Sequence, residues 1–263
     1  MKPGIYNISN EEYHSSPGIS RSGLMLFRKS PLHYWDRYLN PDREKEKDKA
    51  HYKFGRALHT SILEPNLFNS RYVVKPKIDG RKTENKKLKI QWEQDNLGKE
   101  ILNDVDYEKI MRITDSIRRD KTTQWFIEGL QYEKSIYWKE GDLTCKIRPD
   151  GFDVPSGKSF ILDIKSTTDA SKRPFYYSAK NYGYFLQAAM LSIGYESLYG
   201  VKPDRVVYLA FEKESPYCSR IFNIPQRKID EGTQEYYDLL SIYEECYCNN
   251  KWEGYPPEDL DLD

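Results

Sequence analysis

The feature that most constrains the fold is a change of hydrophobic period near Trp125. Before it, apolar residues recur at helical spacing over 32–39, 51–63 and 106–119,. After it come short segments rich in β-branched and aromatic residues, separated by Gly- and Pro-containing turns: 132–138, 143–149 and 159–165,. A helical stretch over 174–199, strands over 206–212 and 218–224, and a helix over 231–248 complete the chain. This order predicts an α/β, or mixed α+β, protein in which a three-stranded meander belongs to a mixed sheet flanked by helices.

The whole chain, 1–263, is predicted to form one domain, because no repeat, low-complexity tract or Gly/Ser-rich linker divides it,. Within it, 1–125 is mainly helical, 126–225 holds the sheet, and 226–263 holds a helix and an acidic tail. Hydrophobic residues are only 38%, but 22 Tyr, 10 Phe and 5 Trp supply large apolar rings for a core,. With no apolar run of membrane-spanning length and no signal-like N-terminus, we expect a cytoplasmic protein.

The charges balance, with 41 basic and 41 acidic residues, which argues against a protein that coats nucleic acid through bulk electrostatics,. Their distribution is uneven: Lys75 to Lys89 is Lys-rich, and the tail after Trp252 is acidic. The first run is either a phosphate-contacting or a simply solvated segment. The cysteines lack CxxC spacing and are expected to be reduced thiols rather than zinc ligands, with a scattered iron–sulfur cluster as the alternative: Cys145, Cys218, Cys246 and Cys248,.

Two carboxylates and one ammonium fall on neighbouring predicted strands. Asp150 closes one strand, and Asp163-Ile164-Lys165 lies in the next. Because side chains alternate along a strand, Asp163 and Lys165 share one face. Oxygen ligands of this kind suit Mg²⁺, and Lys165 can serve an activated water beside it. The alternative is a surface ion pair next to an ordinary Pro-Asp-Gly turn.

In this sequence Pro149-Asp150 is followed by Asp163-Ile164-Lys165, and this order resembles the signature of the PD-(D/E)XK nuclease superfamily. Gly55 to His59 resembles the Gly-x-x-x-His motif of its RecB-like branch. With Ser30-Pro31-Leu32-His33-Tyr34, the order of motifs is similar to that of the RecE (exonuclease VIII) nuclease domain. The resemblance implies a restriction-endonuclease-like core with the order α-β-β-β-α-β.

The resemblance also implies roles for individual residues. His59, Asp150 and Asp163 would bind the metal, Mg²⁺ with Mn²⁺ as a substitute, and Lys165 would serve the attacking water. Gln187 matches a glutamine that lies near substrate or lysine. Leu191 stands where many relatives carry a tyrosine, and Tyr184, one turn earlier, is the candidate replacement.

Two groups of residues have no firm role. Glu133 is either an extra acid near the metal or a solvent-facing residue of a strand. His14, His33 and His51 are expected to be structural.

The function that the resemblance implies is Mg²⁺-dependent 5′-to-3′ digestion of double-stranded DNA ends, leaving 3′ overhangs for recombination in phage or prophage. It further implies a ring-shaped homo-oligomer, a tetramer rather than a trimer, and a RecT-like single-strand annealing protein as partner. Arg21, Ser22 and Arg28 are the candidate contacts to the 5′ phosphate. Two alternatives remain: an endonuclease or structure-specific nuclease of phage or defence systems, and a non-catalytic DNA-end-binding module whose acidic residues form a structural ion-pair network.

Overall fold

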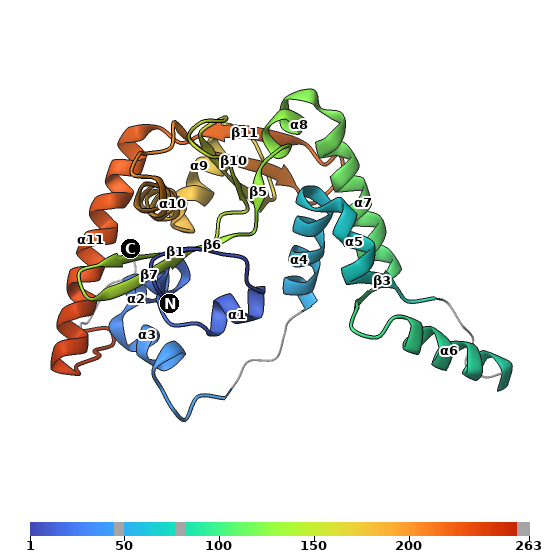
Figure 1. The fold of residues 1–263 in the computed structure, drawn as a ribbon, viewed down its shortest axis with the longest axis horizontal. Helices are drawn as coiled ribbons and strands as arrows, with labels where there is room; N and C mark the ends of the chain where they lie inside the picture. The colour runs from blue at the N-terminus through green and yellow to red at the C-terminus, as the bar shows by residue number, and fades with distance from the viewer. Residues whose placement is uncertain (45–49, 77–82, 257–263) are drawn as a thin grey trace, which may run out of the picture.

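The computed structural model describes residues 1–44, 50–76 and 83–256 (Figure 1). The helices are α1 (Asn10–Ser15), α2 (Arg21–Lys29), α3 (Pro31–Tyr38), α4 (Ala50–Leu63), α5 (Pro65–Arg71), α6 (Thr83–Asp95), α7 (Asp104–Arg119), α8 (Lys121–Ile127), α9 (Lys172–Asn181), α10 (Tyr184–Tyr199) and α11 (Gln226–Asn249). The strands are β1 (Gly4–Tyr6), β2 (Ile19–Ser20), β3 (Tyr72–Val74), β4 (Glu100–Leu102), β5 (Gln131–Tyr132), β6 (Ser135–Glu140), β7 (Leu143–Ile147), β8 (Gly151–Phe152), β9 (Phe160–Thr167), β10 (Arg205–Glu212) and β11 (Ser219–Asn223).

Parallel and antiparallel strand pairs are mixed in the two larger sheets. One sheet has the order β11-β10-β9-β8-β5, with β9 and β10 parallel and the other neighbours antiparallel. The second has the order β1-β6-β7-β2, in which only β2 and β7 are parallel. Helices flank both, so the predicted mixed α/β fold class is confirmed (Figure 1).

The predicted three-stranded meander is wrong in one respect, because its strands belong to different sheets. β6 pairs with β7, but β9 pairs with β8 and β10. The chain leaves β7 at Arg148, and Pro149 has no N–H with which to continue a ladder. Instead, the Asp150 carboxylate accepts a hydrogen bond from the Ile164 N–H of β9 at 2.5 Å. The turn therefore attaches to β9 through a side chain.

Two other predicted elements are interrupted, and each break has a backbone cause. The predicted strand 132–138 divides into β5 and β6 at Glu133, whose φ is 52°. The predicted helical stretch 174–199 divides into α9 and α10 at Gly183, whose φ is 66°. The positive φ favours glycine there, and a Cβ at Gly183 would also displace the flexible end of the Met25 side chain,.

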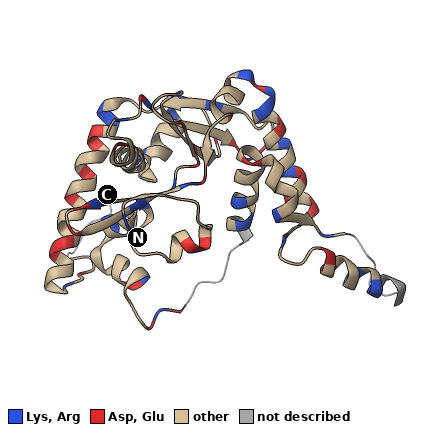
Figure 2. Ribbon diagram, in the orientation of Figure 1, with Lys and Arg blue, Asp and Glu red and all other residues tan. Residues whose placement is uncertain are grey.

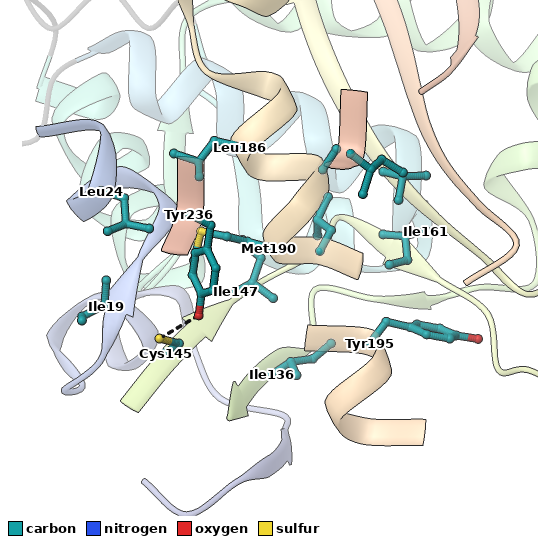
Figure 3. Packing of buried hydrophobic residues seen from close by; sticks show 14 of the residues in the cluster. Ile19, Leu24, Ile136, Cys145, Ile147, Ile161, Leu186, Met190, Tyr195 and Tyr236 are labelled. Carbon is teal, nitrogen blue, oxygen red and sulfur yellow. Dashed lines mark hydrogen bonds between the residues drawn. The ribbon is translucent and has the colours of Figure 1, made fainter. Parts of the chain in front are cut away.

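Strands β9 and β10 lie between two hydrophobic clusters, and alternate residues face each one. Phe160, Leu162 and Ile164 pack with α4, α7 and α8. Ile161 packs in the other cluster, with α2, α10 and α11 (Figure 3). Asp163 and Lys165 therefore project to the α10 side, as their alternation in the sequence predicts.

The four cysteines differ in burial: Cys145 is buried, Cys246 is half-buried, and Cys218 and Cys248 are exposed. Cys145 is buried in the first cluster, where Tyr236 donates a hydrogen bond to its sulfur at 3.1 Å (Figure 3). Burial raises the pKa of this thiol to about 12. All four cysteines are free, and no cysteine belongs to a group of described residues suited to hold an ion.

Basic and acidic residues are interspersed along most of the ribbon (Figure 2). Residues 77–82 of the Lys-rich run and 257–263 of the acidic tail lie outside the described residues. The rest of the Lys-rich run leads into α6, which Figure 1 shows apart from the sheets. Among the described helices, none combines the length and apolar character needed to span a bilayer.

We expect Gly232→Ala in α11 to destabilise the protein, because the added Cβ would lie 2.2 Å from the Phe185 carbonyl oxygen of α10. Such overpacking costs about 1–3 kcal/mol. Gly55→Ala is the matched control, since a Cβ there meets nothing within 4 Å and removing a helical glycine stabilises by about 1 kcal/mol,. In urea unfolding, the midpoint concentration should fall for Gly232→Ala and rise for Gly55→Ala relative to the native protein. Equal stability of Gly232→Ala and the native protein would contradict this packing.

Candidate active site

A cleft of about 750 Å³ lies between the N-terminal segment and helices α4 and α5. The sequence-predicted residues His59, Asp150 and Gln187 line it, together with Glu133. They come from α4, the turn after β7, α10 and the break between β5 and β6. Segments far apart in the chain thus meet at one wall of the cleft.

One half of the site is a group of an imidazole and two carboxylates. His59 Nδ1 lies 3.3 Å from Asp150 Oδ1 and 4.0 Å from Glu133 Oε1. One ligand atom from each of these three residues lies within 4.8 Å of the other two. The spacing allows all three to contact a single ion.

The other half is a buried arrangement of Asp163, Lys165 and Gln187. Lys165 Nζ lies 2.5 Å from Asp163 Oδ2 and donates to Gln187 Oε1 at 2.7 Å. The Gln187 amide donates to Asp163 Oδ1 at 2.6 Å. Each group therefore fixes the other two, and the hydrogen bond from Ile164 N to Asp150 joins this half to the first.

The charges of the two halves shift one another's pKa values. Burial acts to lower the pKa of His59, but the charge and hydrogen bond of Asp150, with Glu133 and Asp163, outweigh it and raise the pKa to about 9. Burial raises the pKa of Asp163 to about 6, which Lys165 only partly offsets. Burial and the neighbouring Asp150 raise the pKa of Glu133. Asp150 differs from the other two carboxylates, because His59 and Lys165 outweigh its burial and lower its pKa.

This donor set fits a hard divalent cation. Carboxylate oxygens and an imidazole converge, and Asp163 Oδ2 is buried without a hydrogen bond, since Lys165 contacts it outside hydrogen-bonding geometry. His59, Asp150 and Glu133 would hold the ion. Asp163, the third ligand that the resemblance implies, is not a member of this group and instead contacts Lys165 and Gln187. When bound, such an ion supplies Lewis-acid stabilisation of a phosphate and lowers the pKa of water. Mg²⁺ and Mn²⁺ both accept ligands of this kind.

Glu133 and Arg148 are the parts of the site that sequence reasoning left open or missed. Arg148 donates to Glu133 Oε2 at 2.8 Å, to Ser135 Oγ at 2.9 Å and to the Ile8 carbonyl at 3.0 Å. The left-handed backbone of Glu133, rare for a side-chain-bearing residue, turns it out of the strand,. The one available signal was the position of Arg148, directly before Pro149-Asp150.

The proposed DNA contacts separate into two places. Arg21 and Ser22 line the cleft, whereas Arg28 does not and instead pairs with Glu235 of α11 at 3.2 Å. Arg21 Nε is buried without a hydrogen bond in the described structure. The Tyr184 ring centroid lies 4.6 Å from Lys165 Nζ, so Tyr184 contacts Lys165 and does not line the cleft.

Neither His14 nor His33 belongs to the group formed by His59, Glu133 and Asp150. His14 lines the cleft beside the N-terminal segment, and His33 Nδ1 lies 2.6 Å from Ser30 Oγ. Only the backbone of His51 is described. Leu191 is buried in the core, one turn beyond Gln187.

We expect metal affinity to rise with pH, because below pH about 9 an ion must displace a proton from His59,. Because binding releases one proton, the metal affinity should rise about tenfold for each pH unit until His59 is neutral. Mn²⁺ titration calorimetry in buffers of different ionisation enthalpy measures the proton released. His59→Gln should abolish this release between pH about 6 and about 9. A native affinity that does not change with pH would contradict the assignment.

Comparison with known proteins gives a family and a fold. The model of a family described as a PDDEXK-like domain of unknown function (DUF3799) matches residues 20–258. No curated protein matches the chain. A candidate exonuclease from Eubacterium rectale aligns with a TM-score of 0.66 and 15% identity, over 94% of this chain and 89% of its own. A phage-related exonuclease from Haemophilus somnus 129PT aligns with a TM-score of 0.37 and 15% identity, over 90% and 99% of the two chains, which is too weak to argue from. The chain therefore belongs to the PDDEXK-like domain family DUF3799, and its fold is that of the PD-(D/E)XK nucleases.

Proposed function

We propose that the protein is a divalent-metal-dependent exonuclease that digests the 5′-ended strand of duplex DNA and leaves a 3′ overhang. The observation that carries the proposal is that His59 and Asp150 line the cleft. The hydrogen bond from the Ile164 N–H to Asp150, together with Gln187, joins them to the Asp163–Lys165 pair behind the cleft wall. The description of the Eubacterium rectale protein as a candidate exonuclease agrees with it.

Within this proposal, Lys165 is the residue that acts on the attacking water. Its ammonium is held by Asp163 and Gln187, and the Tyr184 ring covers it at 4.6 Å. A cation fixed in this way can donate a hydrogen bond to a water or to a phosphate oxygen without reorganising. Gln187 is then a positioning residue, because it contacts both Lys165 and Asp163.

The start of α2 supplies the candidate contact to a 5′ phosphate. Helix N-termini favour anions, and Arg21 is the first residue of this helix,. Arg21 and Ser22 line the same cleft as His59 and Asp150, which would place a terminal phosphate near the metal group. A ring-shaped homo-oligomer and a RecT-like annealing partner also belong to the proposal, and the family resemblance alone supports them.

Asp163→Asn and Lys165→Met should each reduce cleavage by about a thousandfold or more while DNA binding is largely retained, since both remove charge needed in the transition state. The assay uses linear duplex labelled at each 5′ end and closed circular DNA, with Mg²⁺ or a chelator. We expect the label to be released from the 5′ ends of the linear duplex and the closed circles to remain intact. Nicked circles would support the endonuclease alternative. Unchanged cleavage by Asp163→Asn would mean that the acidic residues form only an ion-pair network.

Arg21→Ala should reduce the preference for 5′-phosphorylated over 5′-hydroxyl ends about tenfold, the usual effect of losing a hydrogen bond to a charged group. Arg28→Ala is the matched control, because Arg28 lies on the same helix but pairs with Glu235. Its preference should match that of the native enzyme. The ratio of kcat/KM for the two substrates is the measurement. An equal loss in both variants would count against a phosphate site at Arg21.

A further inference from the structure

Helix α9 and the turn to α10 present three exposed tyrosines. Tyr176, Tyr177 and Tyr182 are 42%, 50% and 61% exposed. Large exposed rings gathered in one short segment are unusual unless the segment binds something. We name the segment 172–182 the α9 surface.

The charge of this region is one-sided. Residues 172–182 include Lys172, Arg173 and Lys180 but no Asp or Glu. Next to them lie Asp169, which accepts a hydrogen bond from the Ser171 N–H, and the Lys228–Glu231 pair of α11. The three cations of the α9 surface are exposed. The region therefore suits a polyanion rather than an average protein surface.

The cations and rings of the α9 surface lie beside one another. Residues three and four apart share a helix face, which aligns Arg173, Tyr177 and Lys180. The Arg173 guanidinium lies 6.0 Å from the Tyr177 ring centroid, and the Tyr176 and Tyr177 centroids are 5.8 Å apart. Rings next to cations on one face offer stacking and phosphate contacts together.

The α9 surface is continuous with the active site. The Tyr182 and Tyr184 rings stack with centroids 6.0 Å apart, and Tyr184 lies over Lys165. Arg21 of the cleft donates a hydrogen bond to the Tyr182 carbonyl. A strand at the catalytic lysine would thus be close to the exposed rings.

We propose that the α9 surface binds single-stranded DNA, with bases stacked on Tyr176, Tyr177 and Tyr182 and phosphates at the neighbouring cations. Stacking on aromatic rings is tolerant of sequence, as an enzyme that proceeds along any strand requires. The inference rests on the proposed exonuclease function, which creates a single strand next to the site. The bound strand is then the 3′ overhang left by digestion.

The test measures binding of a fluorescein-labelled oligothymidylate by anisotropy, with a chelator present so that no cleavage occurs. The double variant Tyr176→Ala, Tyr177→Ala should weaken binding at least tenfold, because each stacked base contributes substantially to affinity. The corresponding double Phe variant keeps the rings and should bind as the native protein does. Tyr247→Ala, an equally exposed tyrosine at the far end of α11, should change nothing.

The logarithm of the binding constant falls linearly with the logarithm of the salt concentration. Lys180→Gln should reduce the slope of this line by about 0.7, the value expected for the loss of one phosphate contact on a single strand. Native-like binding by the double Ala variant, or an equal loss with Tyr247→Ala, would overturn the proposal. A change in the sedimentation coefficient of the double Ala variant without a change in binding would also overturn it, because the surface would then be an interface between copies of the chain.

The same measurement separates this proposal from the proposed function. If the native protein degrades no DNA but the double Ala variant still loses oligothymidylate binding, the exonuclease function fails and the α9 surface stands. If the native protein digests linear duplex and the double Ala variant binds oligothymidylate normally, the function stands and the α9 surface fails.

Discussion

The contact between Asp163 and Lys165 on strand β9 is the interaction on which the site depends. A buried charge is costly unless it is paired and hydrogen-bonded, and here both charges lie on the inner side of a strand between two hydrophobic clusters,. Gln187 contacts both partners, so α10 must pack against this face of the sheet for the pair to be satisfied. The requirement couples the position of α10 to the chemistry of the site.

Irregular backbone next to β9 completes the site. Glu133 leaves a strand through a left-handed conformation, and Asp150 follows Pro149 at the point where β7 ends. Both carboxylates reach His59 because neither remains in a regular ladder. The left-handed conformation of Glu133 costs energy, and the hydrogen bond from Arg148 to its carboxylate holds it in place,. The Ile164 N–H does the same for the Asp150 carboxylate.

The convergence of Glu133, Asp150 and His59 explains why a cation belongs at the site. Lys165 is the cation beside Asp163, yet burial still raises the pKa of Asp163 to about 6. An ion would favour the ionised carboxylates and the neutral imidazole, so metal binding and proton release are linked. Helix α10 connects this centre to the α9 surface, since Tyr184 lies between Lys165 and Tyr182.

The sequence by itself determined the element types, the shared face of Asp163 and Lys165, and the motif order that includes His59 and Gln187. The element types and the shared face follow from short-range periodicity, which depends on residues a few positions apart. The roles of His59 and Gln187 follow from the family resemblance of the motifs. Only the tertiary structure decided that Glu133 joins His59 and Asp150, that Arg148 holds Glu133, and that Arg28 lies away from the cleft. Those outcomes depend on backbone breaks and on contacts between distant segments, which no local pattern encodes.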